Sequence, residues 1–315
     1  VFTGDKSIRK RPVQPLLTAL NQLGAQSSTT REGNACAPFF IKGPIRGGEV
    51  NVPCTTSQYI SSLMIAAPIC DGNIRITTDH PAEIPYLDMT IKWLKEAGIQ
   101  VTYDEKEHKF FEIKGNQKYK AFDKYMPSDW SSVAFPTVAA LTPASNLTIR
   151  NMDFKDSQGD AAVIDQLIRM GADIQKHEAS GDLIIHGGKQ LHGISMDLKN
   201  TPDALPILCV AGCMADNVAG ARLKETDRVS VMTEALSLMG ADISATENTI
   251  TIHGGKKLRG CVQDSHGDHR IAMALTVAGM SAEGCTEITG AECASVTFPN
   301  FYPKMQSCGV KIELD

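Results

Sequence analysis

Charged side chains of both signs crowd one predicted helix start, in the segment RLKETDRVSVMTEALSLMGADI at residues 222–243. Lys224, Glu225, Asp227 and Arg228 lie where an amphipathic apolar pattern begins. Basic groups at a helix N-terminus oppose the helix dipole, so they are unfavourable there unless an anion binds beside them. Arginine and lysine can hold phosphate or carboxylate, and a positioned carboxylate can move protons. The cluster therefore favours an anion-binding catalytic site over a lattice of surface ion pairs.

Polar residues also mark other predicted helix starts, at corresponding places in successive segments. They are Arg9, Lys10, Arg11, Thr56, Ser57, Gln58, Glu83, Tyr86, Asp129, Ser131, Ser132, Asp156, Ser157, Gln158, Asp203, Asp268, His269 and Arg270. A helix N-terminus offers unpaired N–H groups and a partial positive charge, so several of them facing one cleft would bind anions strongly.

Each group also has a plainer interpretation. Ser131, Ser132 and Ser157 are typical N-cap residues. Residues 9–11 are typical of a solvated basic turn, and residues 268–270 of a capped helix with a surface histidine. The recurrence of such groups at matching positions nevertheless favours the anion site.

A sequence repeat positions these helix starts. An apolar helix that ends in glycine, followed by a strand, occurs five times. The terminal glycines lie 69 to 74 residues apart, at Gly24, Gly98, Gly171, Gly240 and Gly309. Glycine is typical of the left-handed position just after a helix. After each of the first four comes a second strand: FFIKG, FFEIKG, LIIHGG and TITIHGG.

A further strand and helix separate each such group from the next. The strand segments are GGEVNVP, DKYMPS, GISMDL and CVQDS. One full unit is therefore β-α-β-α-β-β, which predicts an α/β fold of repeated units rather than a Rossmann sheet. The first unit opens in its middle and the last lacks its closing strand, so we expect a missing N-terminal segment. The predicted domains are residues 1–124, with one and a half units, and residues 125–315, with nearly three.

Composition excludes several other classes of protein. The 315-residue chain has a net charge of −5, so it offers no general basic surface for nucleic acid. No apolar run reaches the roughly 18 residues of a membrane span. Nine cysteines without a C-x-x-C pair argue against a zinc ribbon and a disulfide framework, and fit a reducing cytoplasm. Cys209 and Cys213 are predicted core residues. We expect a cytoplasmic monomer that binds neither metal nor membrane.

Four stretches carry a resemblance to a known family: RLKETDR, GDHRIAMAL, TTSQYISSLMIAAP and IRKRP. IPYLDMT, TPDALP and TFPNF support it. In these motifs, their order and their spacing, the chain resembles the 5-enolpyruvylshikimate-3-phosphate (EPSP) synthases, the 3-phosphoshikimate 1-carboxyvinyltransferases. The resemblance covers the whole chain and the last three quarters of such an enzyme. It implies the enolpyruvyl transferase fold: two domains with pseudo-threefold symmetry and a site in the cleft between them.

The resemblance also implies a reaction. The enolpyruvyl group of phosphoenolpyruvate is transferred to the 5-hydroxyl of shikimate 3-phosphate and phosphate is released, in the pathway to chorismate and the aromatic amino acids. No metal or organic cofactor is implied. By position, Asp203 and Glu225 would be the acid–base carboxylates, and Lys224 would contact the attacking hydroxyl. Shikimate 3-phosphate would be bound by Thr56, Ser57, Gln58, Tyr86, Asp203 and Lys224. Phosphoenolpyruvate would be bound by Arg11, Gln58, Arg228, His269 and Arg270.

Several positions depart from the family pattern. Thr56 replaces a usual serine but keeps the hydroxyl. Glu83 stands where many members have a serine that contacts the substrate phosphate. Val296 occupies the place of a lysine that binds phosphoenolpyruvate in many members. The family's N-terminal lysine and arginine belong to the segment that we expect to be missing, so we expect this chain alone to be inactive.

Two alternatives remain open. UDP-N-acetylglucosamine enolpyruvyltransferase shares the fold and the donor, but KETDR and DHR argue against it. The chain could also be a non-catalytic fragment, for which anion binding without turnover would be the sign.

Overall fold

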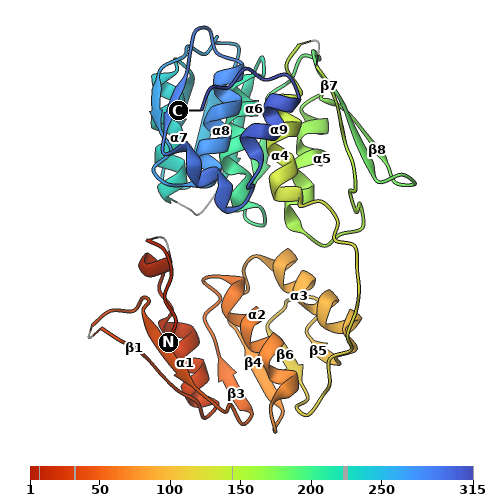
Figure 1. Ribbon diagram of the computed structural model, residues 1–315, viewed down its shortest axis with the longest axis vertical. Helices are drawn as coiled ribbons and strands as arrows, with labels where there is room; N and C mark the ends of the chain where they lie inside the picture. Colours follow the sequence, from red (N-terminus) through yellow and green to blue (C-terminus); the bar gives the residue numbers. More distant parts are fainter. Residues whose placement is uncertain (7, 32, 144, 223–225, 315) are drawn as a thin grey trace. The chain divides into compact units, whose positions relative to one another are not determined.

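Two compact units make up the computed structural model, which describes residues 1–6, 8–31, 33–143, 145–222 and 226–314. Unit 1 comprises Val1–Tyr125 and unit 2 comprises Met126–Asp315. Both are mixed α/β structures, and each has its own hydrophobic core (Figure 1). In the described part of the chain, no helix is long and apolar enough to span a bilayer.

Unit 1 is built around a four-stranded sheet with the strand order β3-β4-β6-β5. Its strands are β3 (Gly48–Asn51), β4 (Ile74–Thr77), β5 (Val101–Tyr103) and β6 (Phe110–Ile113). Strands β3 and β4 are parallel, and the other neighbours are antiparallel. The remaining elements are η1 (Ile8–Lys10), α1 (Gln14–Gln22), the antiparallel pair β1 (Gln26–Thr29) and β2 (Phe39–Lys42), α2 (Ser57–Ala66), η2 (Ala67–Ile69) and α3 (Ile84–Glu96).

Helices α2 and α3 contact each other and share the core of unit 1 with the sheet. In β4, Ile74 and Ile76 alternate with less buried residues, as expected for a strand with one covered face. In α2, Ile60, Leu63 and Met64 recur at helical spacing and are fully buried. Because α2 and α3 pack against the core through their apolar faces, the positions of their first residues are determined by this packing.

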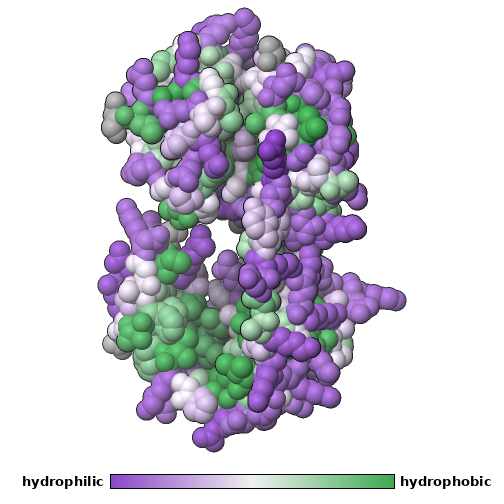
Figure 2. Space-filling view, turned by 45° about the vertical axis from the view of Figure 1, so that its right-hand side comes forward, coloured by the Kyte–Doolittle hydropathy of each residue, from purple (hydrophilic) through white to green (hydrophobic). Residues whose placement is uncertain are grey.

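Unit 1 also leaves apolar surface uncovered. Ile65, in α2, is 54% exposed, and Ile69, in η2, is 71% exposed. Figure 2 shows a broad apolar area on the surface of this unit.

The described residues of unit 2 form three sheets, ordered β7-β9-β8, β10-β11-β13-β12 and β14-β15. The strands are β7 (Asn146–Ile149), β8 (Asp173–His177), β9 (Asp182–His186), β10 (Ser195–Asp197), β11 (Val218–Arg222), β12 (Asp242–Ala245), β13 (Thr249–His253), β14 (Val262–Asp264) and β15 (Glu287–Thr289). The helices are α4 (Trp130–Ala139), η3 (Gly159–Ala161), α5 (Ala162–Arg169), η4 (Pro202–Ala204), α6 (Leu205–Cys213), α7 (Thr226–Leu238), α8 (His269–Met280), η5 (Ala291–Val296) and α9 (Phe301–Ser307).

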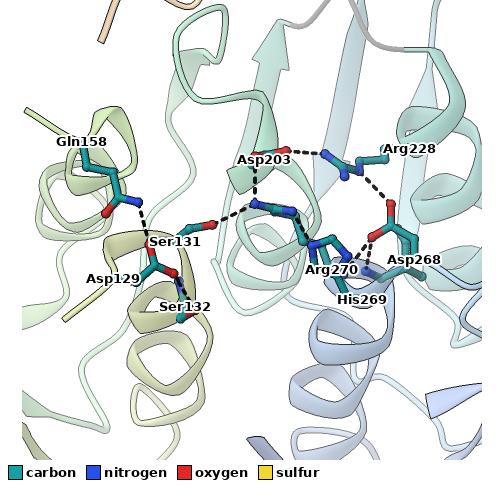
Figure 3. A network of polar contacts seen from close by, with 10 residues as sticks. Asp129, Ser131, Ser132, Gln158, Asp203, Arg228, Asp268, His269 and Arg270 are labelled. Atoms are coloured by element: carbon teal, nitrogen blue, oxygen red, sulfur yellow. Dashed lines mark hydrogen bonds and ion pairs between the residues drawn. The ribbon is translucent and has the colours of Figure 1, made fainter. Parts of the chain in front are cut away.

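Helices α4, α6 and α8 contact one another and form the centre of unit 2. Every residue of α6 is buried, which is typical of a helix that is apolar on all sides. Cys209 and Cys213 lie in this core, as the sequence predicts, and burial raises the pKa of the Cys213 thiol to about 12. The starts of these three helices meet at one end of the core, where polar side chains replace apolar ones (Figure 3).

The repeat predicts most elements correctly. All five helix-terminal glycines have positive φ, between 83° and 98°. The sheet β10-β11-β13-β12 has the same order and the same parallel and antiparallel neighbours as β3-β4-β6-β5. The described residues thus include the predicted unit topology twice.

Two strand predictions are wrong. Residues 123–128, all of them described, form no strand: Tyr125 is 83% exposed, and the segment meets the end of β7 through the Ser128 backbone N–H, which donates to the Asn151 carbonyl oxygen at 2.8 Å, without forming a ladder. Residues 310–314, also described, form no strand after α9. A strand needs a run of backbone pairs with a neighbouring strand, and neither segment forms such a run among the described residues.

Candidate active site

The carboxylate of Asp203 lies between two guanidinium groups in unit 2 (Figure 3). Its Oδ1 accepts a hydrogen bond from Arg228 Nη1 at 2.6 Å, and its Oδ2 pairs with Arg270 Nη2 at 2.8 Å. The two arginine side chains are only 15% and 14% exposed. Three helix starts supply these groups: Asp203 belongs to η4, just before α6, and the arginines belong to α7 and α8.

Asp268 is the second carboxylate of this network. Its Oδ2 accepts from Arg228 Nε at 2.9 Å. Its Oδ1 caps helix α8 by accepting from the backbone N–H of Arg270 at 2.8 Å. The Arg228 guanidinium therefore lies between the carboxylates of Asp203 and Asp268. Asp268 both caps α8 and orients this guanidinium.

Charge balance inside the network follows from its geometry. Burial would raise the pKa of Asp268, but the adjacent Arg228 outweighs it and holds this pKa below its ordinary value. Burial would lower the pKa of Arg228, but the charges of Asp268 and Asp203 outweigh it and raise that pKa. Burial, and then the charge of Arg270, lower the pKa of His269, which favours its neutral form. Two cations thus face two anions beside a neutral imidazole.

Arg270 has further contacts at the start of α4. Its Nη2 donates to Ser131 Oγ at 3.1 Å, and its Nη1 contacts His269 Nε2. Its Nε is buried and has no hydrogen-bond partner among the described residues. An unsatisfied buried donor is costly, so an acceptor that arrived with a ligand would be favoured here.

Asp129 fixes the position of Ser131. It is the N-cap of α4 and accepts from the backbone N–H of Ser131 at 3.3 Å and of Ser132 at 2.9 Å. Gln158 Nε2 donates to Asp129 at 2.5 Å, while Gln158 Oε1 accepts from the Trp130 backbone N–H at 2.7 Å. The N-cap interpretation of Ser131 and Ser132 is therefore wrong: both lie in the first turn, behind the cap.

Unit 1 contributes a second polar cluster, at the starts of α2 and α3. Thr56 is the N-cap of α2, and Ser57 is only 3% exposed. The carboxylate of Glu83 accepts from the backbone N–H of Ser57 at 2.9 Å and from its hydroxyl at 2.7 Å. Gln58 is exposed and Tyr86 is half-buried. This cluster is polar and carries a carboxylate at its centre.

Arg11 lies in unit 1, directly after η1, and is exposed. The next residue is tied to helix α2, because Tyr59 Oη donates to the Pro12 carbonyl oxygen at 2.6 Å. The basic turn of residues 9–11 is thus anchored beside the start of α2, although its side chains extend into solvent.

The predicted site residues fall into two groups. Unit 2 brings together Asp203, Arg228, His269 and Arg270, and unit 1 contains Arg11, Thr56, Ser57, Gln58 and Tyr86. Lys224 and Glu225 lie outside the described residues.

The sequence analysis placed Asp268 and Ser131 at helix starts but gave neither a role in the site, and the structure places both in the network. The place of Asp268 before a helix predicts a cap, but no sequence pattern shows that the same carboxylate also reaches Arg228. Among the described residues, no cluster of His, Cys, Asp and Glu could hold a metal ion. Arginines that converge at helix starts are instead suited to phosphate and carboxylate groups.

Comparisons with family models, curated proteins and solved structures all match the same family. The family model described as EPSP synthase (3-phosphoshikimate 1-carboxyvinyltransferase) matches residues 1–305. A 3-phosphoshikimate 1-carboxyvinyltransferase of Acetivibrio thermocellus is 42% identical, over 99% of this chain and 74% of that protein. One of Ruminiclostridium cellulolyticum is 43% identical, over 100% of this chain and 74% of that protein. Among solved structures, an EPSP synthase from Acinetobacter baumannii superposes with a TM-score of 0.83 at 29% identity, covering 99% of this chain and 74% of that one.

The family model spans the segments that carry both polar clusters, and the relatives exceed two-fifths identity over nearly the whole chain. The chain belongs to the EPSP synthase family of 3-phosphoshikimate 1-carboxyvinyltransferases.

Proposed function

We propose that this protein transfers the enolpyruvyl group of phosphoenolpyruvate to the 5-hydroxyl of shikimate 3-phosphate and releases phosphate. The observation that carries the proposal is the position of Asp203, a carboxylate between two half-buried arginines at converging helix starts. The reaction forms a C–O bond between two anionic substrates and moves protons as it does so, and it therefore needs both cations and a positioned carboxylate.

Arg228 and Arg270 hold the phosphate and carboxylate of phosphoenolpyruvate in this proposal, with His269 beside them. Both guanidinium groups form ion pairs with carboxylates. An incoming anion can compete for their N–H groups, and the buried Nε of Arg270 offers one donor without a competitor among the described residues. When the arginines turn to the substrate, the carboxylate of Asp203 is released for proton transfer.

Asp203 and Glu225 then act as acid–base groups, and Lys224 contacts the attacking hydroxyl. The 5-hydroxyl oxygen bonds to C2 of phosphoenolpyruvate, its proton passes to a carboxylate, and the methylene carbon receives a proton. In the second step, the methyl group returns a proton to a carboxylate as the bond between C2 and the phosphate oxygen breaks. A positioned acid or base contributes about 10²–10⁴-fold to such a step.

Thr56, Ser57, Gln58 and Tyr86 bind shikimate 3-phosphate in the same proposal, and Arg11 and Gln58 assist with phosphoenolpyruvate. The finer fold assignment is also part of it: each unit derives from pseudo-threefold repeats of β-α-β-α-β-β. The shared topology of the two four-stranded sheets supports that assignment.

Phosphate release tests the proposal. We expect release only when phosphoenolpyruvate and shikimate 3-phosphate are both present, and none when UDP-N-acetylglucosamine replaces the acceptor. Because the match covers 74% of the Acetivibrio thermocellus relative, the assay compares this chain with a fusion to the uncovered part of that relative. We expect turnover in the fusion and none in the chain alone. Release without an acceptor, or no release in either form, would contradict the assignment.

A further inference from the structure

The carboxylate of Glu83 occupies the start of helix α2. Its Oε2 accepts three hydrogen bonds: from the Ser57 backbone N–H at 2.9 Å, from Ser57 Oγ at 2.7 Å and from Thr56 Oγ1 at 3.3 Å. Glu83 is not part of α2; it is the residue before α3 and belongs to a segment that is distant in sequence. One carboxylate oxygen therefore takes up both hydroxyl groups and the first backbone donor of this helix start.

These contacts are the ones that a bound anion would make. The first N–H groups of a helix have no partner within the helix, and the helix dipole favours negative charge beside them. Ser57 is 3% exposed, so its donors are not freely solvated when the carboxylate leaves. The Glu83–Ser57 contact therefore has a fixed, buried geometry and is unlike an exposed surface hydrogen bond.

The backbone of Glu83 is arranged to deliver the side chain. Its φ is 52° and its ψ is 44°, the left-handed region that non-glycine residues rarely adopt. Its carbonyl oxygen accepts from the Tyr86 backbone N–H at 3.0 Å, which joins this conformation to the first turn of α3. The two helix starts are thus connected through one residue.

We infer that Glu83 is an internal competitor for the phosphate of the substrate, and sets the affinity of the protein for it. The inference rests on the proposed function, in which Thr56 and Ser57 bind shikimate 3-phosphate. A carboxylate and a phosphate cannot share the same donors, because like charges in contact repel each other. The phosphate must displace the Glu83 side chain. Breaking the hydrogen bonds of Glu83 costs free energy, and this cost lowers the affinity for the substrate.

The opposite role makes the opposite prediction. If Glu83 stayed in place and accepted a hydrogen bond from a substrate hydroxyl, its removal would weaken binding. The sign of the change in affinity therefore distinguishes a competitor from a direct ligand.

Calorimetric titration with shikimate 3-phosphate tests the inference. Glu83→Gln keeps the size of the side chain and removes its charge, and we expect it to bind about 10–100-fold more tightly than the unmodified protein, equivalent to about 1.4–2.8 kcal/mol. Glu105→Gln is the matched control: it removes one charge from an exposed position in the same unit and should leave the affinity unchanged. Ser57→Ala should weaken binding.

A second variant guards against misfolding. Glu83→Asp keeps the charge but is one methylene shorter, so it reaches the helix start less well and should also bind more tightly. Unchanged or weaker binding by folded Glu83→Gln and Glu83→Asp, together with normal turnover of the fused form that carries the same substitutions, would overturn the inference and leave the proposed reaction intact. Unchanged binding by Ser57→Ala would remove this helix start from the phosphate site. Absence of binding in every form would overturn both.

Discussion

Asp203 Oδ2 and Arg270 Nη2 lie 2.8 Å apart and join the start of α6 to the start of α8. This ion pair has a structural effect, because it fixes two central helices of unit 2 relative to each other. It also keeps a carboxylate and a guanidinium next to each other until a stronger acceptor arrives for the arginine. Removing one member of a buried pair leaves the other uncompensated, so each single substitution tests both effects.

Substitution of Asp203 should reduce turnover without abolishing anion binding. Asp203→Asn keeps the shape of the side chain but cannot take up the proton as a carboxylate does, so we expect a loss of about 10²–10⁴-fold in kcat. Phosphate release in the active form is the measurement. Asp165→Asn is a suitable control, because Asp165 is 64% exposed and pairs with Lys176, away from the Asp203 network. Near-normal turnover of Asp203→Asn would remove Asp203 from the mechanism.

Substitution of Arg270 should weaken phosphoenolpyruvate binding. Arg270→Ala removes charged donors from a half-buried site, which is worth about 1.5–3 kcal/mol. Arg270→Lys should recover only part of this loss, because lysine keeps the charge but not the fork of donors. Calorimetry with phosphoenolpyruvate in the presence of shikimate 3-phosphate measures both. Arg169→Ala, at an exposed position of α5, should bind normally. Equal affinity in all three variants would make Arg270 a structural residue.

Substitution of Asp268 should lower stability in a pH-dependent way. The pKa of Asp268 is lowered in the folded protein, so its contribution is complete above the ordinary value of about 3.9 and is lost as the pH falls through the folded value. We expect Asp268→Asn to lower the free energy of unfolding by about 1–3 kcal/mol at pH 7. Urea unfolding should show this difference shrinking below about pH 4. A difference that stayed constant down to pH 3 would show that the ionised carboxylate is not its source.

The sequence predicts the positions of the helices and strands better than it predicts which strands pair with each other. The periodic glycines and the apolar patterns identify helices and strands, because local backbone conformation and burial on one face depend mainly on residues that are close in sequence. Residues 123–128 are not a strand, because a strand needs regular pairing with residues that are distant in sequence, and this segment makes only isolated contacts with residues 150 and 151.

The site shows the same division. Asp203, Arg228 and Arg270 could be named from motifs, and the structure brings them within hydrogen-bond distance. The double role of Asp268, and the hold of Glu83 on Ser57, could not be foreseen. Both join residues from separate helix starts, and a carboxylate before a helix has the same sequence signature whether it caps its own helix or reaches another.

The two units should differ in local stability. Unit 2 surrounds three mutually packed helices, and every residue of α6 is buried. In unit 1, Ile65 of α2 and Ile69 of η2 are 54% and 71% exposed. Regions with less buried apolar contact open at lower free energy, so amides of α2 should exchange faster than those of α6.

Hydrogen exchange followed by mass spectrometry measures this difference directly. We expect peptides from residues 57–66 to lose protection before peptides from residues 205–213, in this chain and under one set of conditions. Ile65→Gln gives a check on the cause, because it changes an exposed apolar side chain without touching the buried face of α2. If the exposed Ile65 side chain affects solubility but not local opening, peptides 57–66 should still lose protection before peptides 205–213 in this variant. Equal protection of α2 and α6 would show that the two cores are equally stable.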